Sequence, residues 1–131
     1  KPVDGLETVD EQLNVLDRLS LREQSIMLED TLRQLPELER MFAQLHALYL
    51  ARDLGRIAKL ADEQQAKGNR EVGRKVMDQL LTQRNRRMAE RAEPYLRQGN
   101  AFIAVGALHL PGQDGVLSLL AKRGYRISVV Y

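Results

Sequence analysis

The fold class is predicted from residues 101–131, which read AFIAVGALHL PGQDGVLSLL AKRGYRISVV Y. The continuous apolar run at 101–105, bounded by turn residues, predicts a strand that is buried on both faces. Residues 125–131 are rich in β-branched side chains and predict a second strand. Between them, apolar side chains recur at helical spacing up to Gly124, which suits the left-handed position just beyond a helix. Residues 99–131 are therefore predicted to form a parallel β-α-β unit with a right-handed crossover, and the fold class is α/β.

Residues 1–98 are predicted to be a helical insert of about five helices that precedes this unit. Two helix starts carry a capping box, in which a hydroxyl and a glutamate three residues later satisfy free backbone donors. These pairs are Thr8 with Glu11 and Ser20 with Glu23. Apolar side chains then recur at helical period along the segment. Taken by itself, the chain is predicted to have α+β content, with the helices first.

Two parallel strands alone leave their edges and faces uncovered, so a buried parallel pair needs more sheet. We therefore expect residues 1–131 to be a single domain that is the C-terminal portion of a larger domain, with further strands upstream of Lys1. The alternative is that the strands pair with a second copy, which predicts a homo-oligomer through exposed strand edges. A start at Lys1 rather than Met suggests a processed or trimmed chain, so the localisation is left unknown.

Composition and charge exclude several classes of function. The 20 basic and 18 acidic residues leave a net charge of +2, and the densest basic cluster, Arg84, Arg86 and Arg87, is followed by glutamates. No nucleic-acid partner is therefore expected. The absence of cysteine excludes a disulfide framework, a thiolate nucleophile and a cysteine-ligated zinc. No apolar run approaches the roughly 18 residues that span a bilayer, so no transmembrane segment is expected in this chain.

His109 is the strongest candidate for chemistry. It follows Gly106 by three residues, in a turn that also contains Pro111 and Gly112, at the carboxyl end of the first predicted strand. Ligands of open α/β sheets bind outside those ends, and histidine is the commonest metal ligand and the usual acid or base near neutral pH. The alternative is a loop histidine that bonds to a backbone carbonyl, because a single Gly-x-x-His motif has low specificity.

Arg84 interrupts the apolar stripe of the longest predicted helix, between Leu80 and Met88. An unpaired buried guanidinium is costly, so either Arg84 has a buried partner or it lines a cavity. Asn85 lies beside the same stripe, where an amide on the helix surface is the alternative to a site residue. His46 stands between apolar neighbours, and we interpret it as packing or facing a partner rather than binding a metal.

Several short motifs occur in a fixed order along the chain: Gly5-Leu6-Glu7-Thr8 with Gln12, Arg84-Asn85, the segment FIAVGALHLPG at 102–112, Gly115, Leu119-Leu120 and Gly124-Tyr125. In this order they resemble proteins of the TraB/GumN family, which is named for a plasmid pheromone-shutdown protein and a polysaccharide-cluster protein. The resemblance covers most of the chain, and its specific part is the carboxyl-terminal block. Family members carry two Gly-x-x-His elements, whereas this chain has only the second.

The resemblance implies a metal-dependent hydrolase that acts on peptides, because related animal proteins of the TIKI type are metalloproteases. It implies His109 and Glu7 as ligands of a divalent metal ion, and His109, Arg84 and Asn85 as catalytic residues of the same pocket. Carboxylate and imidazole ligands suit such an ion, and an arginine can stabilise a developing oxyanion. The alternative for Glu7 is an ordinary first-turn carboxylate that interacts with the helix dipole.

A more distant similarity links the family to a haem-binding lipoprotein and to erythromycin esterases, which makes haem a less favoured cofactor than a metal ion. The family also favours a periplasmic or cell-envelope location. Two further hypotheses remain beside the hydrolase with a peptide or small-molecule substrate. One is a non-catalytic binding or regulatory protein that sequesters a peptide, haem or a cell-surface component. The other is a helical interaction module that uses the apolar stripe from Leu38 to Tyr49.

Overall fold

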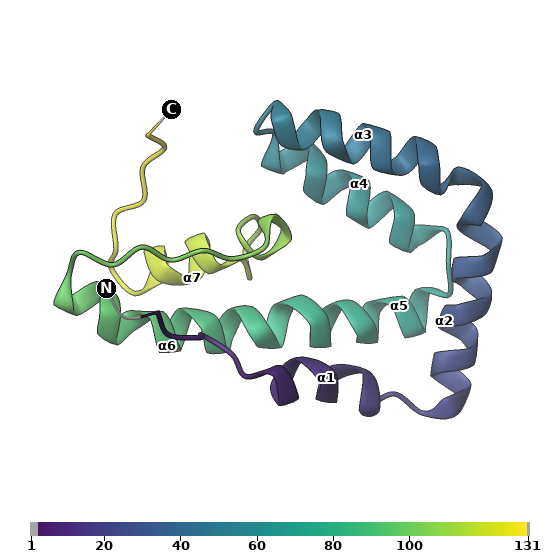
Figure 1. Cartoon of the computed structure of the whole chain (residues 1–131), viewed down its shortest axis with the longest axis horizontal. Helices are drawn as coiled ribbons and strands as arrows, with labels where there is room; N and C mark the ends of the chain where they lie inside the picture. The colour runs from purple at the N-terminus through teal and green to yellow at the C-terminus, as the bar shows by residue number, and fades with distance from the viewer. Residues whose placement is uncertain (1–2, 131) are drawn as a thin grey trace.

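Residues 3–130, the part of the chain that the computed structural model describes, form a series of helices with extended segments near the carboxyl end (Figure 1). The α-helices are α1 (Val9–Asp17), α2 (Leu21–Gln34), α3 (Leu38–Leu50), α4 (Leu54–Ala66), α5 (Arg70–Met77), α6 (Gln83–Gln98) and α7 (Val116–Lys122). Two 3₁₀ turns, η1 (Leu35–Glu37) and η3 (Ala107–His109), and one π-helical turn, η2 (Asp78–Thr82), complete the helical elements of these residues.

The two predicted capping boxes are present and fix where α1 and α2 begin. At α1 the Thr8 hydroxyl accepts from the Glu11 backbone N–H at 3.2 Å, and the Glu11 carboxylate accepts from the Thr8 N–H at 2.9 Å. Ser20 and Glu23 make the same reciprocal pair at α2. Each box satisfies two of the backbone donors that a helix start leaves without an internal partner.

Helices α5 and α6 are two halves of one rod, because η2 joins them without a break in helical backbone (Figure 1). A π-helical turn spaces its hydrogen bonds by five residues, so it changes the direction in which later side chains project. The two halves therefore present different faces to different neighbours. Val72 and Val76 of α5 pack in one buried cluster with residues of α2, whereas Met88 and Ala89 of α6 pack with α7.

The other helices pack around this rod. Helix α2 crosses the end formed by α5, and α3 and α4 form an antiparallel hairpin (Figure 1). Helix α1 lies beside α6, where the Arg91 guanidinium donates to the Glu11 carboxylate at 2.6 and 2.7 Å and to the Leu6 carbonyl at 2.9 Å. The segment that leads into α1, which includes Glu7, is thereby held against α6.

The turn η3 is held between the α3–α4 hairpin and α6. Leu108 packs against the buried cluster of Leu48, Ile57 and Leu60 in that hairpin. The next residue, His109, contacts Asn85 of α6. One short turn therefore connects two parts of the core and carries the candidate histidine between them.

The predicted β-α-β unit is wrong, and so is the α/β fold class, because no strand is formed within residues 3–130. The segments 100–106 and 125–130 run without helical structure and without pairing to another strand. Phe102 is 93% exposed and Val129 is 89% exposed, so these side chains are not buried in a sheet. β-Branched and aromatic residues favour strands because they pack on a neighbouring strand, and here no such neighbour is present.

The helix between the two segments, α7, is present, and Gly124 just beyond it has the expected positive φ, +92°. The helix-rich part before Gly99 is also present. The homo-oligomer predicted through strand edges loses its basis in the described residues, since no strand edge exists there. Over the same residues, none of the helices has both the length and the apolarity needed to cross a bilayer.

Candidate functional site

His109 is buried against α6, with 8% of its surface exposed. Its Nδ1 lies 2.6 Å from Oδ1 of Asn85, a residue 24 positions earlier that is itself only 3% exposed. The turn that carries the histidine is closed by its own backbone N–H, which donates to the Gly106 carbonyl at 2.9 Å. Asn85 is therefore not a helix-surface amide, and two of the predicted site residues are in direct contact.

The contact with Asn85 determines which nitrogen of the imidazole carries the proton. Asn85 Nδ2 donates to the Asp114 carbonyl at 2.8 Å, which leaves Oδ1 facing the histidine. Because an amide oxygen only accepts, Nδ1 of His109 is the protonated nitrogen and Nε2 carries the free lone pair. Within residues 3–130, Nε2 makes no hydrogen bond and is not among the fully buried atoms that lack a partner. The basic nitrogen is thus accessible to a ligand.

The surroundings of His109 keep the imidazole neutral. Burial lowers the pKa of His109 below its ordinary value, and the positive charge of Arg84 lowers it further. The negative charge of Glu7 raises the pKa and only partly opposes these effects. At pH 7 the side chain is therefore the neutral base that can bind a metal ion or accept a proton.

Arg84 has a buried partner, which decides between the two alternatives that its position in the apolar stripe left open. Its Nε lies 3.0 Å from both carboxylate oxygens of Glu7, and its Nη2 donates to Oε2 at 2.8 Å. The Glu7 side chain is 3% exposed and that of Arg84 is 16% exposed. Arg84 Nη1 also donates to the Leu80 carbonyl at 3.3 Å. The pair is a buried, bidentate ion pair of the kind whose breakage leaves a costly isolated charge.

Glu7 remains ionised in this environment. Burial by itself raises the pKa of the carboxyl group, but the hydrogen bonds and charges of Arg84 and then Arg87 outweigh it. The net effect is a pKa below the ordinary value for glutamate. Arg87 contributes through Nη2, which lies 3.5 Å from Glu7 Oε1.

The four predicted site residues thus form two adjacent pairs, Glu7 with Arg84 and His109 with Asn85. The pairs meet on α6, where Arg84 and Asn85 are consecutive. No hydrogen bond joins one pair to the other among residues 3–130. Their charges nevertheless act on one another, since both Arg84 and Glu7 shift the pKa of His109.

The three glycine positions of the turn differ in whether the backbone conformation or the space available excludes a side chain. Gly112 has φ +86°, which a residue with a side chain adopts only under strain. A Cβ on Gly106 would come no closer than 3.5 Å to His109 Cδ2, so this glycine keeps one edge of the imidazole uncovered. A Cβ on Gly115 would lie 2.1 Å from the Pro111 carbonyl oxygen, a distance that the backbone cannot tolerate. Gly115 therefore allows the turn to close onto the start of α7.

The residues present fit a divalent metal ion only in part. His109 offers a prepared imidazole, since metal-ligating histidines usually donate their other ring N–H to a fixed acceptor. The Glu7 carboxylate, however, is already held by Arg84 and Arg87. No group of three or more histidine, aspartate or glutamate side chains arranged to hold a metal occurs among residues 3–130.

Arg87 and Asp114 also belong to this site, although neither is among the residues predicted for it. The spacing of three residues between Arg84 and Arg87 could have indicated Arg87, because it places both on one helix face. Asp114 contributes only its backbone carbonyl, which no side-chain pattern can reveal. Gly115 was recognised as a matching residue, but its close contact with Pro111 became visible only in the folded chain.

A helical protein with a buried histidine–asparagine pair beside an arginine–glutamate pair is the class that this geometry defines. Residues 1–129 match the family model described as the TraB/PrgY/gumN family, and the chain belongs to that family. The match includes both pairs and the turn from Gly106 to Gly115. No curated protein and no solved structure matches the chain.

Proposed function

We propose that the protein is a metal-dependent hydrolase that acts on peptides, in which His109 supplies one metal ligand through Nε2. The observation that carries this proposal is the hydrogen bond from His109 Nδ1 to Asn85 Oδ1. It fixes both the tautomer and the orientation of the ring, as an outer-shell acceptor does in metal sites. Membership in the TraB/PrgY/gumN family supports a common function for the region that contains this pair.

Each of the other site residues has a distinct role in this proposal. A divalent metal ion bound at Nε2 would lower the pKa of a coordinated water to near neutrality. Asn85 is a positioning residue, because its amide is fully used by His109 and the Asp114 carbonyl. Arg84 keeps a fixed positive charge beside the imidazole, which stabilises negative charge that develops on a substrate.

Glu7 joins the ligand set only if Arg87 releases it and one of its oxygens turns from Arg84 to the metal ion. The 3.5 Å contact from Arg87 to Oε1 is the longest contact to this carboxylate, so it is the weakest and the easiest to break. The proposal takes the remaining ligands from outside residues 3–130, since no group of three or more potential metal ligands occurs within them. Under this proposal the Glu7–Arg84 pair holds the site together before the metal ion is bound.

The engagement of Glu7 favours a second candidate, a protein that binds a peptide without cleaving it. With both carboxylate oxygens held by arginines and no third metal-binding side chain nearby in residues 3–130, the same region can bind without catalysis. The two candidates differ in a single measurable property, turnover.

Metal titration by calorimetry tests the role of His109, with Zn²⁺, Mn²⁺ and Co²⁺ added separately. The variant is His109→Ala, and the matched control is His46→Ala, because His46 is exposed on α3 and is the only other histidine of the chain. We expect the metal affinity to fall at least tenfold in His109→Ala and to be unchanged in His46→Ala. Equal affinity in the two variants contradicts the proposed ligand.

Hydrolysis of a mixture of peptides, followed by mass spectrometry, tests the reaction. The metal-loaded protein is expected to cleave peptides, and the activity should be lost in His109→Ala and retained in His46→Ala. Tight peptide binding without cleavage by the metal-loaded protein would instead support the binding protein. Cleavage that persists in His109→Ala contradicts the catalytic site.

A further inference from the structure

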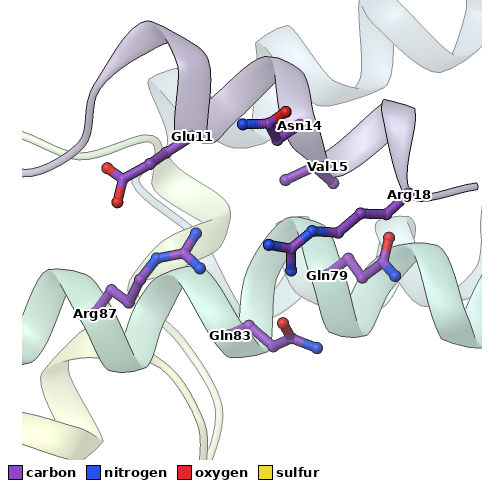
Figure 2. Close-up of a pocket in the computed structure, with 7 residues that line it drawn as sticks. All are labelled: Glu11, Asn14, Val15, Arg18, Gln79, Gln83 and Arg87. Carbon is purple, nitrogen blue, oxygen red and sulfur yellow. The ribbon is translucent and has the colours of Figure 1, made fainter.

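A polar pocket lies between α1 and the rod, next to the π-helical turn (Figure 2). Its volume is about 110 Å³. It is lined by Glu11, Asn14, Val15 and Arg18 from α1 and its carboxyl end, and by Gln79, Gln83 and Arg87 from η2 and α6. Neither His109 nor Arg84 lines it, and Arg87 is the one lining residue that the pocket shares with the candidate site described above.

Two guanidinium groups reach into this pocket from opposite sides. Figure 2 shows Arg18 extending from the α1 side and Arg87 from α6, with both guanidinium groups directed into the space between the helices. Like charges that converge in this way repel each other unless an anion lies between them. The arrangement therefore favours a negatively charged occupant.

The ion pairs at this interface leave the two arginines without full compensation. Glu11 is held by two short hydrogen bonds from Arg91, and Glu7 by three from Arg84. Arg87 shares Glu7 only at 3.5 Å, and Arg18 has no ion-pair partner within residues 3–130. Counted over Arg18, Arg84, Arg87 and Arg91 against Glu7 and Glu11, this network has a net charge of +2, although the Glu11 carboxylate itself lines the pocket.

Two side chains of the pocket wall carry buried polar atoms with no hydrogen-bond partner among the described residues, Arg87 Nε and Gln79 Oε1. Arg87 Nε is a donor and calls for an acceptor, whereas the Gln79 oxygen is an acceptor and calls for a donor such as the hydroxyl of a hydrogen phosphate. A buried polar atom without a partner is destabilising, and native proteins contain few of them. Gln79 owes its place in the wall to η2, and π-helical turns occur frequently at functional sites.

We propose that this pocket binds a phosphate group, either as inorganic phosphate or as the phosphoryl group of a larger molecule. A phosphate at pH 7 carries about −1.5 to −2 charges, which matches the net charge of +2 of this network. The planar fork of a guanidinium binds phosphate oxygens in pairs. A cavity of about 150 Å³ admits a molecule as large as benzene, so 110 Å³ is enough for a phosphate but not for a nucleotide. Arg18 is exposed, so the remainder of a phosphorylated molecule can extend past it into solvent.

Calorimetric titration of the whole chain with inorganic phosphate, at constant ionic strength set with potassium chloride, tests the proposal. Arg18→Gln removes one guanidinium group from the pocket without breaking an ion pair, so folding should be unaffected. Arg22→Gln is the matched control, because Arg22 is also exposed, also lacks an ion-pair partner within residues 3–130, and does not line the pocket. We expect the Kd for phosphate to rise about tenfold in Arg18→Gln and to stay within about twofold in Arg22→Gln.

Three further measurements sharpen the result. Arg18→Lys keeps the charge but loses the fork, so its Kd should lie between those of the native protein and Arg18→Gln. Glycerol phosphate and inorganic phosphate are compared to distinguish a phosphorylated molecule from the free ion, and tight binding of either supports the pocket. Acetate, a monoanion, should bind at least tenfold more weakly than phosphate. The proposal is overturned if phosphate binds no better than acetate, or if Arg18→Gln and Arg22→Gln have equal affinities.

Discussion

The substitution Asn85→Leu tests the hydrogen-bonded connection between α6 and the histidine turn. Leucine has the same number and branching of side-chain heavy atoms as asparagine, but it neither donates nor accepts a hydrogen bond. In the native chain the Asn85 amide makes one bond to His109 Nδ1 at 2.6 Å and one to the Asp114 carbonyl at 2.8 Å. Both bonds are lost in the variant, and the partner atoms stay in an interior where water does not readily replace the amide, since Asn85 is 3% exposed.

The expected loss follows from the two stranded partners. Each buried donor or acceptor that is left unpaired destabilises the fold by about 1–3 kcal/mol. The added apolar surface of leucine offsets about 1 kcal/mol of this loss. We therefore expect Asn85→Leu to lower the free energy of unfolding by about 1–5 kcal/mol. A domain of this size has about 5–15 kcal/mol in total, so the variant should be folded but much less stable.

Urea denaturation followed by circular dichroism measures the loss, with Asn14→Leu as the matched control. Asn14 is exposed on α1 and its side chain makes no hydrogen bond within residues 3–130, so its replacement should change stability by no more than about 0.5 kcal/mol. The m-value should be the same in both variants, because the surface exposed on unfolding is unchanged. An Asn85→Leu loss as small as that of Asn14→Leu would refute the reasoning, since it would mean that the buried pair carries no net stability.

Three other predictions concern the turn and the pH dependence of stability. Gly115→Ala should lower the free energy of unfolding, measured by urea denaturation, by about 3 kcal/mol or more, because the new Cβ would overlap the Pro111 carbonyl. In Gly106→Ala the new Cβ makes only an ordinary van der Waals contact, so the free energy of unfolding should change by less than about 1 kcal/mol. The folded-state pKa of His109 lies below 6.5, so the unfolded chain takes up the proton first, and the free energy of unfolding should decline as pH falls below about 6.5. A His109→Gln variant should lack this decline. The same pH profile in both proteins would contradict the prediction. Hydrogen bonds from Arg91 and the Thr8 backbone lower the pKa of Glu11 to about 2, so the contribution of Glu11 to stability should be complete above about pH 4.5 and be lost toward pH 2. When the free energy of unfolding is measured at each pH, Glu11→Gln should reduce the change between about pH 4.5 and pH 2.

The helical part of the chain could be predicted because its determinants are local. Thr8 with Glu11, and Ser20 with Glu23, form their capping boxes within a single turn, so three residues of sequence contain the complete interaction. The fold class could not be predicted in this way, because a strand exists only by pairing with another strand. The segments 100–106 and 125–130 have the composition of strands, but composition does not show whether a partner is present.

The contacts among the candidate residues could be predicted from the sequence only in part. Arg84 stood out as a charge in an apolar stripe, and this pattern correctly required a buried partner or a cavity. That Glu7 would be the partner depends on how α1 lies along α6, which is a tertiary contact over 77 positions of sequence. The tautomer of His109 depends likewise on the backbone carbonyl of Asp114, so it follows from the fold alone.

The π-helical turn η2 determines which way the whole carboxyl-terminal half of the rod faces. If Asp78–Thr82 wound as an ordinary α-helix with no residue lost, everything beyond it would be rotated by about 100° around the axis, since an α-helix has 3.6 residues per turn. Val72 and Val76 would keep their contacts with α2, while Arg84 and Asn85 would turn away from both Glu7 and His109. The extra residue in this turn therefore determines how α6 is rotated relative to α5 around the axis of the rod.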